Sequence, residues 1–240
     1  MRREGMRERP ILFSSRMVQA ILEGRKTMTR RPVKPQVACH GWAFELHPFA
    51  PSTLIGTPAE GRKWGPEKKV WVVEDAWKNI IAIYGDCPYG QPGDWLWVKE
   101  TWRPWNDPNL WDVVQYRADM AIIKPKITNE NQGHRFHEDC ESTINDQIDG
   151  LNSPWKPSIH MPRWASRILL EIINVRVDRI QDIAMTDAIA EGYAYGDHPN
   201  DRDGHPKHNF KLSWNATYPG SWDRNDWVWV IEFKRVENEA

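Results

Sequence analysis

The residues most able to do chemistry stand together near the start of the chain, in the run Gly-Arg-Lys-Thr-Met-Thr-Arg-Arg at positions 24–31. A lysine can accept a proton when burial or a nearby cation lowers its pKa, and a threonine hydroxyl beside such a base can act as a nucleophile. If the run is a strand, Thr27, Thr29 and Arg31 share one face and Lys26 lies on the turn before them. The same residues also fit two simpler interpretations, a solvated basic turn or phosphate contacts without catalysis.

A second group of candidates lies in and after the predicted strand 95–102. Glu100 and Trp102 would share a face, so that the carboxylate could bond a base edge while the indole stacks on the base; Lys99 would point the other way. The alternative is an ion-paired residue beside a core tryptophan. Arg163 and Trp164 leave a similar choice, because the guanidinium could pair with a phosphate or cover the neighbouring ring.

One segment has the spacing of metal ligands. His134, His137 and Cys140 follow the pattern H-x2-H-x2-C, and Zn²⁺ accepts such side chains. A fourth ligand is not evident in the sequence, and the surrounding residues are polar without a clear period. We therefore favour a solvated loop over a metal site here, and we expect no cofactor.

Composition narrows the class of protein. The 240 residues carry 32 basic and 33 acidic side chains, so a protein that coats long nucleic acid is disfavoured, although a small nucleotide is not. Three scattered cysteines argue against a secreted disulfide framework, and no apolar run approaches the roughly 20 residues of a membrane span. We expect a cytoplasmic protein with no membrane partner. Most of the fifteen tryptophans should pack in the core, and a few could stack on a base.

Hydrophobic periodicity predicts an α+β fold that is mainly β. The expected strands are 10–13, 27–31, 70–73, 95–102, 113–117, 167–177 with a continuation at 180–183, and 227–236. The expected helices run from Ser14 or Ser15 to Gly24, from a cap at Thr186 to Glu191 with Gly192 as its stop, and over 210–216. We predict one domain over 10–236, with loop-rich insertions at about 36–80 and 119–157, a flexible start at 1–9 and a tail at 237–240. Several strands with few helices suggest a small closed barrel.

Four blocks of the sequence resemble a known family. Residues 10–14 and 21–31 look like the opening of ASCH-domain proteins, and three later blocks look like the longer ASCH proteins often encoded by bacteriophages: 87–90 with 93–102, 160–167, and 221–229. The resemblance implies a PUA-like β-barrel with a few short helices and a cleft that binds RNA or a nucleotide.

A small bacterial branch of that family hydrolyses N4-acetylcytidine with a lysine, a threonine and a glutamate. The resemblance carries these roles to Lys26, Thr29 and Glu191, with Glu100 as a rival for the carboxylate. The candidate ligand contacts are Ser14, Arg25, Arg31, Lys99, Glu100, Trp102, Arg163 and Trp164.

Three functions stay open from the sequence. The chain could bind a nucleoside, nucleotide or RNA without catalysis, or it could hydrolyse an N4-acylated cytidine. It could also be a phage accessory protein whose partner is another protein, with tryptophans at the interface.

Overall fold

The structure is a computed structural model of the chain. It describes the residues 6–34, 36, 57–58, 71–74, 80–84, 87–107, 110–124, 154–195 and 204–236. Most of both predicted insertions, together with the first five residues, the tail 237–240 and the histidine–cysteine segment at 134–140, lies outside the described residues.

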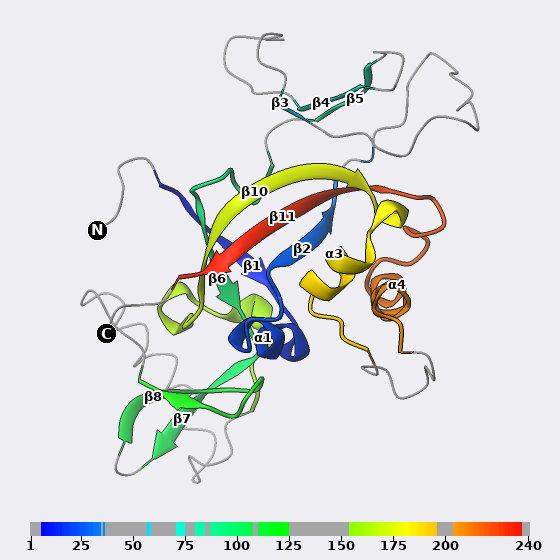
Figure 1. Cartoon of the computed structure of the whole chain (residues 1–240). Helices are drawn as coiled ribbons and strands as arrows, with labels where there is room; N and C mark the ends of the chain where they lie inside the picture. The colour runs from blue at the N-terminus through cyan, green and yellow to red at the C-terminus, as the bar shows by residue number, and fades with distance from the viewer. Residues whose placement is uncertain are drawn as a thin grey trace. The chain divides into compact units, whose positions relative to one another are not determined.

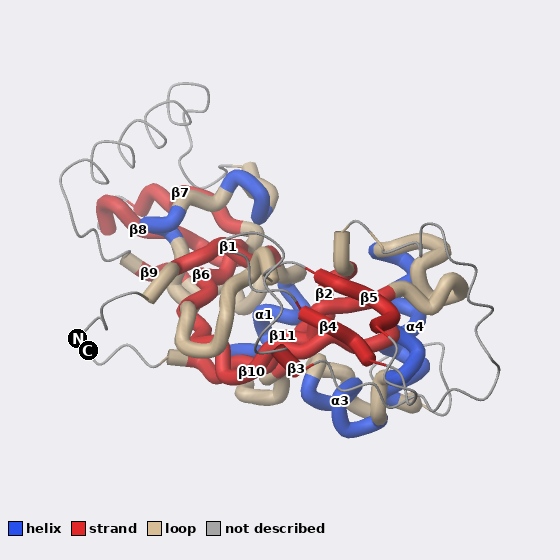
Figure 2. Tube along the Cα trace, turned by 90° about the horizontal axis from the view of Figure 1, so that it is seen from above, coloured by secondary structure: helices blue, strands red, loops and turns tan. Residues whose placement is uncertain are grey.

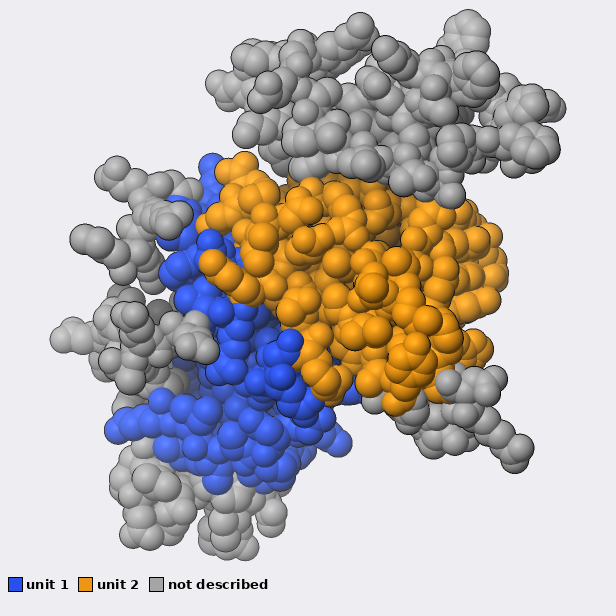
Figure 3. All heavy atoms as spheres, in the orientation of Figure 1, with its two compact units in different colours: residues 1–24, 94–171, 235–240 blue, residues 25–93, 172–234 orange. Residues whose placement is uncertain are grey.

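The chain divides into two compact units, coloured separately in Figure 3. Unit 1 consists of Met1–Gly24, Asp94–Glu171 and Arg235–Ala240, and unit 2 of Arg25–Gly93 and Ile172–Lys234. That residues 10–236 behave as a single domain stays a prediction.

Unit 1 begins with a parallel pair of strands and a helix. Strand β1 (Glu8–Leu12) runs parallel to β6 (Trp95–Lys99), and β6 pairs antiparallel with the first residues of β10 (Leu169–Arg179). In β6 the apolar residues Leu96 and Val98 alternate with half-exposed neighbours, as expected for a strand with one buried face. Helix α1 (Ser15–Leu22) starts at the Ser14 cap and ends before Gly24, whose φ of 76° suits a residue without a side chain. The predicted first strand and first helix are confirmed.

A second sheet of unit 1 is an antiparallel meander, visible in Figures 1 and 2. Its strands are β7 (Trp102–Asp107), β8 (Leu110–Tyr116) and β9 (Ile122–Ile123). Two short 3₁₀ helices follow, η2 (Ser158–His160) and η3 (Arg163–Ala165). The buried core of this part consists of Trp102, Val114, Tyr116, Met161, Trp164 and Ala165.

The predicted single strand 95–102 is wrong. The chain leaves the first sheet after Lys99, and Trp102 begins β7 in the second sheet. At the break, the Glu100 N–H faces the Met161 sulfur, and the backbone of Trp102 exchanges two hydrogen bonds with Lys156. Glu100 and Trp102 therefore do not share the face of one strand.

Unit 2 continues β10 into a sheet with β11 (Trp227–Arg235) and β2 (Met28–Pro32). β11 is antiparallel to β2, with Ile231 opposite Thr29 and Val230 opposite Arg30. Residues 227–231 are all buried, which accounts for their continuous apolar run. A separate three-stranded sheet contains β3 (Thr57–Pro58), β4 (Trp71–Glu74) and β5 (Ile80–Tyr84), and β4 corresponds to the predicted strand 70–73.

The helices of unit 2 differ from the predictions in detail. Residues 180–183 do not continue the strand: Ile180–Asp182 form the 3₁₀ helix η4, and the Ile180 N–H bonds the Asp226 carbonyl. Helix α3 (Met185–Ala190) begins after Ala184, so Thr186 lies inside it and is not its cap. Helix α4 (Pro206–Thr217) packs against α3 and starts earlier than predicted, with a proline in its first turn.

The fold class is confirmed in its coarse form: the chain is α+β and mainly β, with few helices. The described strands form three open sheets and no closed barrel, because β1 pairs only with β6 and β2 only with β11 among the residues described. None of the described helices has the length and hydropathy needed to cross a bilayer.

Candidate functional site

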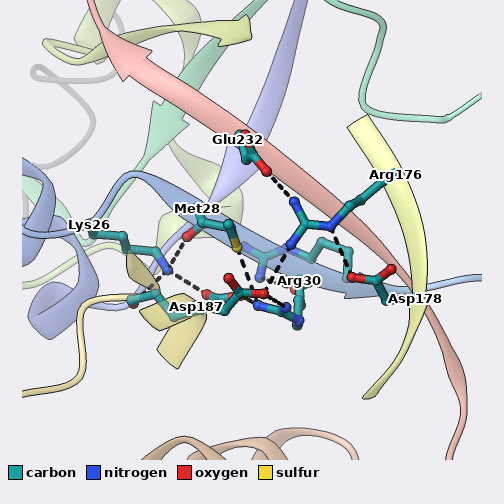
Figure 4. Close-up of polar contacts among 9 residues, drawn as sticks. Lys26, Met28, Arg30, Arg176, Asp178, Asp187 and Glu232 are labelled. Atoms are coloured by element: carbon teal, nitrogen blue, oxygen red, sulfur yellow. Dashed lines mark hydrogen bonds and ion pairs between the residues drawn. The ribbon is translucent and has the colours of Figure 1, made fainter. Parts of the chain in front are cut away.

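Among the described residues of unit 2, Lys26 and Glu191 form a buried ion pair; Lys26 is labelled in Figure 4. The Lys26 Nζ lies 2.7 Å from Oε2 of Glu191, and both side chains are at most 5 % exposed. The ammonium also donates to two backbone carbonyl oxygens, those of Met28 and Glu191, each at 2.8 Å. The structure thus brings together two of the three residues to which the resemblance assigned catalytic roles.

Local backbone bonds explain why these two residues meet. Glu191 is the C-cap of α3, where helix carbonyls have no partner within the helix. The segment before β2 supplies the donors: the Thr27 N–H bonds the Ala190 carbonyl at 2.8 Å, and the Arg25 guanidinium bonds the Gly192 carbonyl at 3.2 Å. Lys26 lies between these two anchors, so its side chain is held at the end of α3.

The pKa of Lys26 is lowered from its ordinary value of 10.5. Burial is the main cause, because it penalises the charged form. Glu191 opposes this by attraction and by its hydrogen bond, while the cations Arg31 and Arg30 lower the pKa further. The site therefore has the property that the sequence analysis required of a lysine acting as a base.

Arg30 is the third member of the cluster, and the sequence analysis did not select it. Its side chain is 1 % exposed, and its Nη2 lies 2.5 Å from Oδ2 of Asp187. Its Nη1 lies 3.5 Å from Oε1 of Glu191 and 3.3 Å from the sulfur of Met28. The signal that could have indicated Arg30 is the spacing of Asp187 and Glu191, because two acids four residues apart share one face of a helix.

Arg176 completes the network on β10 (Figure 4). It pairs with Asp187 at 3.0 Å, with Asp178 at 3.0 Å and with Glu232 of β11. Counted together, the cluster holds three cations, Lys26, Arg30 and Arg176, and four carboxylates, Glu191, Asp187, Asp178 and Glu232. A site so rich in carboxylates is a poor match for phosphate and a better one for an uncharged ligand.

Thr29, the third residue of the catalytic prediction, is 1 % exposed on β2. Side chains alternate along a strand, so Thr29 projects from the opposite face to Arg30. Among the described residues its hydroxyl makes no hydrogen bond with Lys26 or Glu191. Lys26 precedes the strand and is not subject to this alternation.

The other ligand candidates in the first part of the chain, Ser14, Arg25 and Arg31, have structural partners. Ser14 caps α1 by accepting from the Met17 N–H at 3.5 Å. Arg25 bonds the Gly192 carbonyl as described above, and the half-buried Arg31 donates to the carbonyl of Arg30 at 3.1 Å. That any of the three contacts a ligand stays a prediction.

In unit 1, Glu100 is held by a bidentate pair with Arg167. Both carboxylate oxygens lie 2.9 Å from guanidinium nitrogens, and Arg167 also pairs with Asp119. Burial raises the pKa of Glu100, while the hydrogen bonds from Arg167 oppose the increase. Arg167 further stacks on Tyr116, whose pKa burial also raises. With both oxygens engaged, Glu100 has the environment of a structural carboxylate.

The aromatic candidates of unit 1 fall into a core and a surface group. Trp102 and Trp164 are buried and meet edge to face, with ring centroids 5.6 Å apart. Lys99 and Arg163 both lie over the half-exposed ring of Trp97, at 5.5 Å and 5.9 Å. Their other partners are the Ile159 carbonyl for Lys99 and the Glu8 carboxylate for Arg163.

The proposed metal ligands His134, His137 and Cys140 lie outside the described residues. Within the part of the chain that the structure describes, no three histidines, cysteines or acids are grouped so as to hold a metal ion.

Comparisons with known proteins found no match to this chain. No family model matches it, and neither a curated protein nor a solved structure shows significant similarity.

Proposed function

We propose that this chain is a PUA-like protein of the ASCH type that binds a modified nucleoside and hydrolyses the amide of an N4-acylated cytidine. The observation that carries the proposal is the buried pair of Lys26 and Glu191, whose Nζ and Oε2 lie 2.7 Å apart although the residues are 165 positions apart in sequence. The sequence resemblance alone assigned proton transfer to these two residues, and their proximity is what that assignment requires.

The pair can supply a base and an acid by moving one proton. In the ionic form Lys26 is an ammonium and Glu191 a carboxylate. Transfer of the shared proton leaves a neutral amine, which can accept a proton, and a carboxylic acid, which can donate one. Burial penalises the ammonium and lowers the pKa of Lys26, which makes its proton easier to transfer.

In the proposed reaction, Thr29 attacks the acyl carbon and gives its hydroxyl proton to Lys26. The carbon–nitrogen bond breaks, and Glu191 protonates the departing N4 amine of cytidine. Water then attacks the acyl-threonine and gives a proton to Glu191, while Lys26 returns a proton to Thr29. Acetic acid is released and loses its proton to the solvent as acetate, and the neutral pair is restored. Thr29 projects from the face of β2 opposite to Arg30, so this step requires Lys26, which precedes the strand, to reach the Thr29 hydroxyl.

The test is the hydrolysis of N4-acetylcytidine, followed by chromatographic measurement of cytidine. Lys26→Met should lower kcat/KM by about 10²–10⁴-fold, the typical contribution of a positioned acid or base. The exposed Lys34 offers a matched control, and Lys34→Met should leave the rate unchanged. If the folded wild type releases no cytidine, or if Lys26→Met keeps the full rate, the hydrolase proposal is wrong.

One observation favours a second function, binding without catalysis. All three protons of the Lys26 ammonium have acceptors in the structure, as expected for a lysine that serves only to join α3 to β2. Titration with cytidine, monitored by tryptophan fluorescence, separates the two functions. A saturable response from a wild type that does not hydrolyse N4-acetylcytidine would support the binding module.

A further inference from the structure

We propose that Arg30 is a positioning residue, which holds the second oxygen of the Glu191 carboxylate so that the first oxygen stays on Lys26. The inference rests on the proposed function for its kinetic test only. Its geometry and its spectroscopic test concern the ion pair itself.

The two oxygens of Glu191 face two different cations. Oε2 lies 2.7 Å from the Lys26 Nζ, and Oε1 lies 3.5 Å from Nη1 of Arg30. At 3.5 Å the second contact is an ion pair and not a hydrogen bond of normal length. A carboxylate placed between two cations in this way has a fixed orientation, because rotation about its last bond would bring Oε2 away from Lys26.

Arg30 is itself held in place by a series of ion pairs. Its Nη2 lies 2.5 Å from Asp187, one turn before Glu191 on α3, and Asp187 is bound in turn by Arg176 at 3.0 Å. Arg176 is fixed by Asp178 on its own strand and by Glu232 on β11. The guanidinium of Arg30 therefore spans the two acids of α3 from a rigid strand, which is how a supporting residue fixes a reacting one.

Two buried polar atoms at this contact have no hydrogen bond among the described residues: Nε of Arg30 and Oε1 of Glu191. A buried polar atom without a partner is costly, so a purely structural pair would be expected to close the gap. Keeping Oε1 without a hydrogen bond leaves it able to accept one from a bound ligand, such as the amine of a base. The Arg30–Glu191 contact, at 3.5 Å, differs in this respect from the Arg30–Asp187 contact, at 2.5 Å.

The test compares Arg30→Met and Arg30→Lys with the wild type, and uses Asp187→Asn as a second variant that keeps Arg30 but loosens its anchor. The first measurement needs no activity: the Lys26 side chain is titrated by NMR through its ¹³Cε chemical shift. The charged groups that act on Lys26 are Glu191 at the end of α3 and Arg30 and Arg31 on β2. The network beyond Arg30 consists of Asp187, Arg176, Asp178 and Glu232. Arg30→Met changes this titration in two opposed ways, because it removes a like charge that lowers the pKa of Lys26 and also loosens the carboxylate that raises it. Asp187→Asn keeps the charge of Arg30, so the loosened Glu191 should move the Lys26 titration to lower pH.

The second measurement is kinetic, on N4-acetylcytidine. Displacing a reacting group by about 1 Å can cost ~10²-fold in rate, so Arg30→Met should lose about that factor in kcat with little change in KM. Arg30→Lys, which keeps the charge, should recover most of the rate. Asp187→Asn should show a smaller loss in the same direction. Arg224→Met, at an exposed arginine of the same unit, should change neither measurement.

The outcomes are distinguishable. A wild type without hydrolysis would refute the proposed function and leave the Lys26 titration as the test of Arg30. A folded Asp187→Asn variant with an unchanged Lys26 titration would overturn the positioning role, whatever the kinetics. If Arg30→Met does not fold, the Asp187→Asn titration decides.

Discussion

Replacing Glu191 with glutamine tests the central pair directly, because it removes a charge and almost no volume. Lys26 would keep its two carbonyl acceptors, at Met28 and at position 191, but its buried ammonium would lose the carboxylate. Removing one partner of a buried ion pair costs about 3–5 kcal/mol, because the remaining charge is left uncompensated. Since the glutamine oxygen can still accept a hydrogen bond, we expect the lower end of that range.

The effect should be large enough to measure without ambiguity. A loss of about 3 kcal/mol corresponds to a fall in Tm of roughly 6–12 °C for a chain of this size. Glu8→Gln is the matched control, because the pair of Glu8 with Arg163 is partly exposed to solvent and should contribute at most about 1 kcal/mol. Lys26→Met/Glu191→Gln should be less destabilised than Glu191→Gln alone, since no unpaired buried charge remains.

The loss should also depend on pH in a defined direction. The pKa of Lys26 is lowered in the folded protein, so between that value and 10.5 the unfolded chain binds more protons and stability rises with pH. Glu191 raises the pKa of Lys26, and removing it widens this window. Urea denaturation at neutral pH and at a pH just below 10.5 should therefore show a smaller loss for Glu191→Gln at the higher pH. Equal losses for Glu191→Gln and Glu8→Gln at neutral pH would refute the reasoning.

Three further predictions follow from other contacts. Arg167→Met should destabilise the protein by about 3–5 kcal/mol, because it leaves the buried Glu100 unpaired, whereas Arg163→Met should cost at most about 1 kcal/mol; urea denaturation measures both. The Arg167→Met loss should shrink as pH falls, because burial raises the pKa of Glu100 and protonation removes the unpaired charge; a constant loss would contradict this. Gly24→Ala should cost about 1–2 kcal/mol because the φ of Gly24 is 76°, and Gly24→Asn should cost less; equal thermal shifts for the two would argue against backbone strain. Thr29→Val should abolish hydrolysis of N4-acetylcytidine with little change in Tm, and retained turnover would assign the nucleophile elsewhere.

The elements that local pattern predicts well are those whose burial is uniform or strictly alternating. The run at 227–236 matches β11 because both of its faces are buried, and the helix after Ser14 is marked by its cap and by Gly24. The break at Glu100 could not be predicted, because it depends on Met161, Lys156 and Arg167, which are distant in sequence. The prediction of a closed barrel was wrong for the same reason, because pairing between distant strands leaves no signal in the local sequence.

The candidate site shows a similar division. The Lys26–Glu191 pairing was expected from family resemblance and not from spacing, since no periodicity connects residues 165 positions apart. Arg30 was missed because a run of basic residues is usually solvated, and nothing in positions 24–31 indicates that one arginine is buried. Its partner Asp187 shows why: the burial of a charge depends on the countercharge that the fold supplies.

The carbonyls at the end of α3 accept hydrogen bonds from Arg25, Lys26 and Thr27, and this has a consequence for synthesis of the protein on the ribosome. A helix of six residues is too short to be stable alone. The carbonyls at its end accept hydrogen bonds from residues 25–27, which are synthesised far earlier. At about 5–20 residues per second, residues 25–30 are joined to the chain roughly 8–33 s before Glu191. During that interval β2, which carries Arg30, has no β11 to pair with, and α3 has not yet supplied Asp187. The nascent chain should therefore stay sensitive to protease at this strand until residues near 233 have left the ribosome, and then become protected in one late step.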